Sequence, residues 1–157
     1  MLFNNDKCKI MHFGHDNVEM DYLINDVVLG SVVEEKDLGV LIRNDLKVSN
    51  QCSKAVCTAN KVLGMIRRSF TCRSKVVIRT LYKSLVRPHL EYCMQAWRPY
   101  LVKDIEALER VQKRATRLIG GFDRFSYEDR LEILGVTTLE MRRLRGDLLG
   151  VQDCEGF

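Results

Sequence analysis

Residues 74–100 read SKVVIRTLYKSLVRPHLEYCMQAWRPY, and we expect the rest of the chain to be organised around this stretch. Four apolar residues in its first half recur at the spacing of one face of an amphipathic helix: Val77, Ile78, Leu81 and Leu85. We expect Leu81 and Leu85 to be buried. Pro88 lacks an N–H group and restricts the residue before it, so it should end the regular helix, with a short helical piece over residues 89–96 behind it.

The face opposite this apolar stripe is basic. It carries Lys75, Arg79, Lys83 and Arg87. The charge is also unevenly distributed along the chain, with the excess of positive charge in the middle. Residues 52–117 hold fifteen Lys and Arg against four Asp and Glu, a net of +11, whereas the remainder holds ten against seventeen, a net of −7. A basic middle between acidic ends predicts a local surface for a polyanion rather than uniform basicity.

Lys and Arg bind phosphates with little regard to base sequence and release counterions as they do so. Tyr92 and Trp97 could add rings on which bases stack. Helical charges that face solvent in different directions would produce the same composition without any binding. The two interpretations differ in whether the basic side chains converge on one face. The residues that could line one surface are Lys54, Lys61, Arg67, Arg68, Arg79, Lys83, Arg87, Arg110, Lys113, Arg114 and Arg117.

The first third of the chain has β-strand patterns. Residues 7–13 form one strand candidate. Residues 22–29 have the pattern of a hairpin that turns at Asn25 and Asp26. Residues 38–42, LGVLI, are another β-rich run, and the glycine within it predicts a bulge or a close approach of the backbone.

The pattern changes to helical periodicity after Leu46. Residues 104–119 form an amphipathic helix, and the two glycines that follow should end it with a left-handed cap. Residues 126–135 form a shorter helix, and Thr137 with Glu140 fits a capping box that starts the last one. The fold class predicted is α+β, with a small antiparallel sheet at the N-terminus followed by a bundle of about five helices. The first of these helices should bury one face, made of Cys52, Ala55, Val56, Ala59, Leu63, Ile66 and Phe70.

The composition excludes several classes of function. No apolar run approaches the roughly 20 residues that span a bilayer, so no membrane partner is expected. The N-terminus lacks a secretory pattern and none of the six cysteines forms a C-x-x-C pair, which predicts reduced thiols in an intracellular protein. Cys8, His12 and His15 do not supply the two close ligand pairs typical of zinc, so no metal site is expected.

Three runs along the chain resemble one family. Residues 81–101, LYKSLVRPHLEYCMQAWRPYL, resemble the region after the catalytic palm in reverse transcriptases of non-LTR, LINE-type retrotransposons, most of all the jockey-like elements. Residues 104–119 and residues 127–149, YEDRLEILGVTTLEMRRLRGDLL, resemble the same family in the same order. The resemblance implies three parts: a palm-edge β segment over 1–46, a helical thumb-like domain over 47–149 and a divergent tail over 150–157.

Two segments of the first third match motifs of this family. Asn4-x-x-Lys7-Cys8 resembles the palm segment after the catalytic turn, which implies that Lys7 matches a general acid that protonates the pyrophosphate leaving group. Without metal or nucleotide, Lys7 would be an ordinary basic residue at a strand edge. Leu38-Gly39-Val40 resembles the primer-grip turn, although Asp37 stands where many members have an aromatic residue.

The paired aspartates of the family have no counterpart here, because the chain contains no Asp-Asp. In a complete polymerase they hold two Mg²⁺ ions, and the turn that carries them precedes the region matched by this chain. We therefore expect no catalytic residue, no cofactor and no polymerase activity in the isolated chain. Mg²⁺ would belong to the complete polymerase, with an upstream polymerase region as a partner.

Two hypotheses of function follow. The first is a C-terminal fragment of an RNA-directed DNA polymerase that grips a template–primer duplex, either RNA–DNA hybrid or DNA. The second is a helical protein-interaction module, or a relic without function. Under the first hypothesis, the nucleic-acid contacts are Leu38, Gly39, Arg79, Lys83, Arg87, Arg110, Lys113, Arg114 and Arg117.

Overall fold

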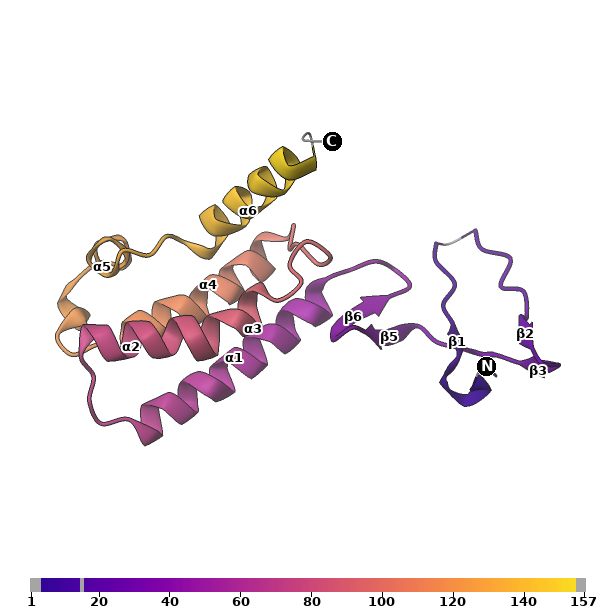
Figure 1. Cartoon of the computed structure of the whole chain (residues 1–157), viewed down its shortest axis with the longest axis horizontal. Helices are drawn as coiled ribbons and strands as arrows, with labels where there is room; N and C mark the ends of the chain where they lie inside the picture. Colours follow the sequence, from indigo (N-terminus) through magenta and orange to yellow (C-terminus); the bar gives the residue numbers. More distant parts are fainter. Residues whose placement is uncertain (1–3, 15, 155–157) are drawn as a thin grey trace. The chain divides into compact units, whose positions relative to one another are not determined.

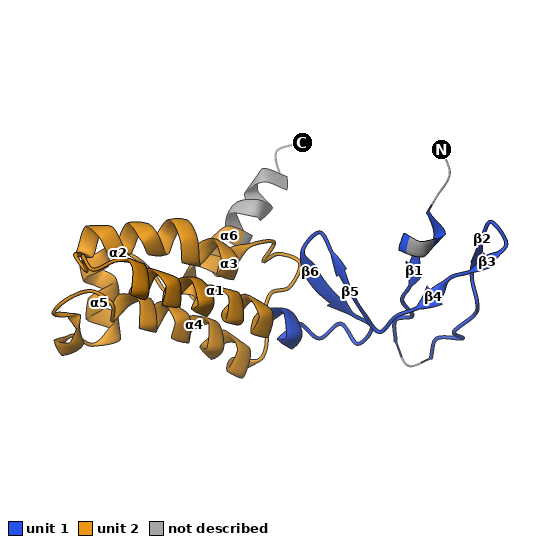
Figure 2. Cartoon of the chain, turned by 90° about the horizontal axis from the view of Figure 1, so that it is seen from below, with its two compact units in different colours: residues 1–51 blue, residues 52–157 orange. Residues whose placement is uncertain are grey.

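The computed structural model describes residues 4–14 and 16–154 (Figure 1). It has the predicted α+β class, with a small sheet region followed by the helices. The chain divides into two compact units, unit 1 over Met1–Gln51 and unit 2 over Cys52–Phe157 (Figure 2). The sequence patterns change at Leu46, and the unit boundary lies at Gln51, inside the first long helix.

Unit 1 contains the predicted hairpin. Strands β2 (Leu23–Ile24) and β3 (Val27–Val28) pair antiparallel around Asn25 and Asp26, whose φ angles are 51° and 60°. A tight two-residue turn of this hand needs positive φ at both central positions, and Asn and Asp tolerate it better than most residues. The structure therefore confirms the predicted hairpin and its turn at Asn25 and Asp26.

A second hairpin corrects the predicted bulge at Gly39. Strands β5 (Glu34–Asp37) and β6 (Val40–Arg43) pair antiparallel, with Asp37 directly opposite Val40. Leu38 and Gly39 are the two residues of the turn, with φ of 43° and 92°. The glycine is thus a turn residue with a left-handed backbone, not an extra residue inside a strand.

The remaining two strands are short and parallel. β1 (Lys9–Ile10) pairs with β4 (Gly30–Ser31) in parallel register. The strand predicted over residues 7–13 is therefore limited to two residues, because a 3₁₀ turn over Asn5–Lys7 precedes it. The antiparallel pairs dominate unit 1, as the sequence predicts.

Unit 2 begins with helix α1 (Ser49–Ser69). The predicted face is largely confirmed, although Phe70 follows the helix and is 39% exposed, and Val56 is half-buried. Small side chains on a buried helical face allow another helix to approach closely. The buried residues of this face are Cys52, Ala55, Ala59, Leu63 and Ile66.

The central helix does not end at Pro88, contrary to the prediction. Helix α2 (Lys75–Leu81) continues through a π-helical segment (Tyr82–Val86) into α3 (Arg87–Glu91). The N–H of Arg87 donates to the carbonyl of Tyr82, which is the wider hydrogen bond of a π-helix. Proline clashes with the carbonyl four residues before it, so widening the turn accommodates the ring without breaking the helix. The helix ends at Glu91, earlier than predicted, because Tyr92 is extended.

The buried stripe of this helix also differs from the prediction. Leu81 is half-buried and Leu85 is 39% exposed, so the expectation that both are buried is wrong. The buried side chains recur every four residues, a spacing that the widened turn keeps on one face. They are Ile78, Tyr82, Val86 and Leu90.

Helix α4 (Val102–Thr116) lies at the centre of unit 2, in contact with α2, α5 and α6 (Figure 1). Helix α5 (Tyr127–Leu134) has the predicted start and stop. Ser126 and Asp129 form a reciprocal capping box, and Gly135 ends the helix in the left-handed conformation. Gly121 is also left-handed, as expected of the glycine pair, although α4 itself ends at Thr116.

The last helix, α6 (Leu139–Cys154), extends beyond the predicted end of the helical region at Leu149. Its cap is Thr138 rather than Thr137, because the Thr138 Oγ1 accepts from the N–H of Met141 at 3.2 Å. The N–H of Leu139, at the first position, donates to Glu109 Oε2 of α4 at 3.0 Å. The start of α6 is therefore hydrogen-bonded to α4.

Candidate nucleic-acid interface

Six of the seven predicted contact residues of unit 2 form two separate basic groups, and the seventh, Arg87, is paired with Glu91. We call the first the α2 group, which consists of the predicted Arg79 and Lys83 together with Lys75. These side chains share one surface groove with Val76 and Thr80. Residues four apart on a helix lie about 6 Å apart along its axis, so the groove presents a row of cations.

Two further arginines face this row. Burial lowers the pKa of the Lys83 ammonium below its ordinary value, and the positive charges of Arg79, Arg87 and Arg142 lower it further. Arg142 comes from α6, far along the chain, and the sequence did not predict it. Arg79 of α2 and Arg87 of α3 lie four residues before and after Lys83, and α6 supplies Arg142.

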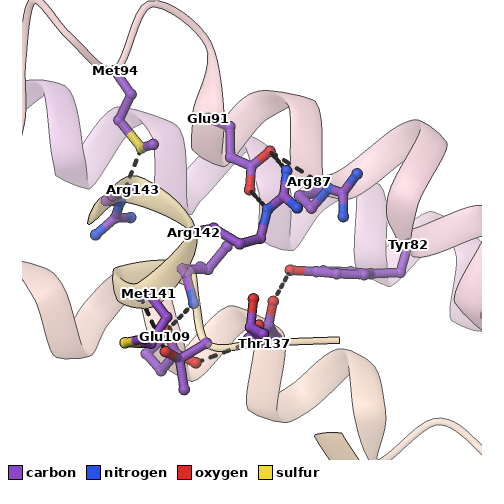
Figure 3. A network of polar contacts seen from close by, with 12 residues as sticks. Tyr82, Arg87, Glu91, Met94, Glu109, Thr137, Met141, Arg142 and Arg143 are labelled. Carbon is purple, nitrogen blue, oxygen red and sulfur yellow. Dashed lines mark hydrogen bonds and ion pairs between the residues drawn. The ribbon is translucent and has the colours of Figure 1, made fainter. Parts of the chain in front are cut away.

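One carboxylate offsets this charge. Glu91, the last residue of α3, accepts from Arg142 Nε at 2.7 Å and from Arg142 Nη2 at 3.3 Å (Figure 3). Its Oε2 also lies 3.5 Å from Arg87 Nε. The hydrogen bonds that Arg142 donates to Glu91 raise the pKa of the Arg142 guanidinium. These contacts join α3 to α6 and leave the row on α2 without a carboxylate among the ion pairs of the described residues.

The second group lies on α4 and just after it, and we call it the α4 group: Arg110, Lys113, Arg114 and Arg117. All four side chains are exposed, as predicted. Arg114 Nη1 donates to Asn60 Oδ1 of α1 at 3.1 Å, and Lys113 Nζ lies 4.9 Å from the centre of the Tyr127 ring. Arg110 and Lys113 share a groove with the carboxylates of Glu106, Glu109 and Glu140, so the local charge there is mixed.

The two groups do not converge on one face. Gln112 of α4 points toward the π-helical segment that follows α2, because its Oε1 accepts from the Tyr82 hydroxyl at 2.5 Å. Arg110 lies two residues earlier, which is about 200° around the helix, so it points away from α2. The single surface that the charge pattern allowed is therefore divided in two, and the α2 group has the less compensated charge.

The other predicted contacts lie elsewhere. Leu38 is 81% exposed at the turn between β5 and β6, with Gly39 beside it, and Lys7 is exposed in unit 1. Trp97 is 2% exposed, and its Nε1 donates to the carbonyl of Tyr92 at 2.7 Å. Its ring is therefore part of the core and cannot stack on bases, whereas Tyr92 is 57% exposed.

The described residues contain no group of three or more His, Cys, Asp or Glu placed to hold a metal ion. His15, one of the three residues considered for zinc, lies outside them. Within the described part of the chain, no helix is both long and apolar enough to cross a membrane. Comparisons with models of protein families, with curated proteins and with solved structures found no match.

Proposed function

We propose that this chain grips the sugar-phosphate backbone of a nucleic-acid duplex, either RNA–DNA hybrid or DNA, through the α2 group. The observation that carries the proposal is the groove that Lys75, Arg79 and Lys83 line together, with no carboxylate among its described lining residues. Burial and the positive charges of Arg79, Arg87 and Arg142 lower the pKa of the Lys83 ammonium, and a bound phosphate would relieve the repulsion between these charges.

The contacts proposed are to phosphates, so binding should not depend on base sequence. The row from Lys75 to Lys83 offers cations at steps of about 6 Å along α2. Thr80 lines the same groove and adds a hydroxyl that can donate to a phosphate oxygen. Arg87 and Arg142 lie beside the row and could extend it.

The resemblance to non-LTR reverse transcriptases supports a specific version of this function. Unit 2 would act as the thumb of an RNA-directed DNA polymerase, and unit 1 as the edge of its palm. Leu38 and Gly39 would contact the primer, and Lys7 would stand at the general-acid position. Catalysis would depend on an upstream polymerase region that supplies the aspartates and their Mg²⁺ ions, so the isolated chain would bind without extending a primer.

Fluorescence anisotropy of a labelled RNA–DNA hybrid across a salt series tests the proposal. Log affinity should fall linearly with log salt, with a slope of about −0.9 for each phosphate contacted. The triple variant Lys75→Glu/Arg79→Glu/Lys83→Glu should weaken binding of all duplexes alike and flatten this slope. Circular dichroism would check that the variant remains folded.

The matched control reverses three charges of the α4 group, in the variant Arg110→Glu/Arg114→Glu/Arg117→Glu. It changes the net charge by the same amount, so it should weaken binding less if the α2 group makes the contacts. A larger loss in the control would assign the contacts to α4 instead. No binding even at low salt would contradict the proposal and favour the protein-interaction module or the relic.

A further inference from the structure

We infer that Glu91 is an internal competitor of the phosphate, holding Arg87 and Arg142 away from the duplex until the duplex displaces it. This inference rests on the proposed function, because it concerns regulation of the same basic face. The three residues form an ion-pair cluster (Figure 3), and Arg87 lies one helical turn after Lys83 of the α2 group. Glu91 is thus placed where a phosphate would have to bind to reach both arginines.

The geometry of the cluster occupies the hydrogen-bonding groups that a phosphate would need. Arg142 presents Nε and Nη2 to the two oxygens of Glu91, at 2.7 Å and 3.3 Å. This is the paired arrangement that an arginine also offers to phosphate. Arg87 directs its Nε at the same carboxylate. Both arginines are therefore bound to an anion that belongs to the chain itself.

The exchange of one anion for another is feasible at Arg142, the most exposed member of the cluster. Its side chain is 39% exposed, whereas those of Glu91 and Arg87 are 21% and 19% exposed. An ion pair in contact with water contributes little net free energy, so a phosphate can replace the carboxylate at little cost. A buried pair would instead resist the exchange, since a lone buried charge is strongly destabilising.

Two bound states follow from this arrangement. While Glu91 holds the arginines, the α2 group alone contacts the backbone. Once Glu91 is displaced, Arg87 and Arg142 can contact phosphates as well, which adds up to two contacts. Because Arg142 belongs to α6, the displacement also releases the ion pair between α3 and α6.

The variant Glu91→Gln tests the inference in the full chain, with the same labelled RNA–DNA hybrid. It should bind the hybrid more tightly than the wild-type chain, because no carboxylate competes with the phosphate for Arg87 and Arg142. Its salt slope should match the wild-type slope, because both chains contact the same phosphates once Glu91 is displaced. Glu128→Gln on α5 is the control, because it removes the same charge from an exposed glutamate. It should have the wild-type affinity.

The outcomes separate this inference from the function on which it rests. If the wild-type chain binds and Glu91→Gln has the wild-type affinity, the competitor role is wrong and the duplex grip stands. If the wild-type chain does not bind at low salt, the grip itself is wrong. If Glu91→Gln does not fold, NMR of the wild-type chain decides. The Arg142 Nε–H resonance should shift as duplex is added, and an unchanged resonance at saturation would overturn the inference.

Discussion

The side chain of Gln112 forms hydrogen bonds with three other segments of unit 2. The side chain is completely buried. Its Oε1 accepts from Tyr82, and its Nε2 donates to Tyr127 Oη and to the Thr137 carbonyl, both at 3.0 Å. Tyr127 also donates to Glu109. A buried polar network whose members are paired favours one arrangement of the helices, because any other arrangement leaves a buried group unpaired.

Tyr82 gives this network a dependence on pH. Burial raises the pKa of its phenol well above the ordinary value of 10.0, and the charges of Glu91 and Glu109 act in the same direction. The folded chain therefore keeps a proton that the unfolded chain loses above about pH 10. The contribution of this phenol to the free energy of unfolding should be constant below that pH. It should then fall by up to about 1.4 kcal/mol per pH unit for this phenol as the pH rises.

Urea denaturation at a series of alkaline pH values measures this effect. Tyr82→Phe should remove the contribution of this phenol and leave that of Tyr127, whose pKa burial and Glu109 also raise. Tyr100→Phe is the control, because its ring is 62% exposed. Equal slopes in all three proteins would show that the Tyr82 proton does not stabilise the fold.

At the scale of elements, local signals in the sequence predicted local structure. Asn25 and Asp26 predicted a hairpin turn, and Ser126 and Gly135 predicted the ends of α5, because each signal acts within a few residues. The widened turn before Pro88 was not predictable in this way. Whether a proline breaks a helix or widens it depends on the packing of the residues around it, and Tyr82 is held there by Gln112.

The candidate site also contains residues that local sequence signals predicted and residues that only tertiary packing brings there. Helical spacing alone placed Arg79 and Lys83 on one face of a helix, and the structure confirms this placement. Arg142 could not be assigned to that site from the sequence, because it reaches the site through the packing of α6. Glu91 was missed for the same reason, since its partner lies on another helix.

Paired substitutions on the central helix test its corrected orientation. Ile78 is 4% exposed, so Ile78→Ala should lower the free energy of unfolding by about 2–5 kcal/mol. Leu85→Ala, at a side chain that is 39% exposed, should cost at most about 1 kcal/mol. Circular dichroism melting compares the two. Similar losses would mean that the buried face of the helix includes Leu85 after all.

At the scale of the whole molecule, the two units have unequal cores. Val40 is the one buried apolar side chain among the described residues of unit 1. Its strands leave large apolar side chains exposed, with Leu23 at 59% and Val28 at 54%. Unit 2 contains a continuous series of buried side chains from α1 to α6. Because burial of apolar surface is the main stabilising contribution, most of the stability should reside in unit 2.

Hydrogen exchange followed by mass spectrometry would measure this difference. Backbone amides of β2 and β3 should exchange through local opening, because few buried contacts hold them. Amides on the buried faces of α1 and α4 should exchange slowest, at a rate set by the unfolding of unit 2 as a whole. Equal protection in both units would contradict the division into a stable and a marginal part.

The π-helical segment also sets the angular phase of the charges on the central helix. In a regular α-helix, residues four apart are rotated by about 40° relative to each other, so a row at that spacing winds slowly around the axis. A wider turn reduces this drift, which keeps Lys83 and Arg87 nearer to one line with Arg79. The winding of Tyr82–Val86 therefore controls which cations and which carboxylate share a face. If the same residues were wound as a regular α-helix, every charge would keep its place along the chain and Glu91 would turn to another side.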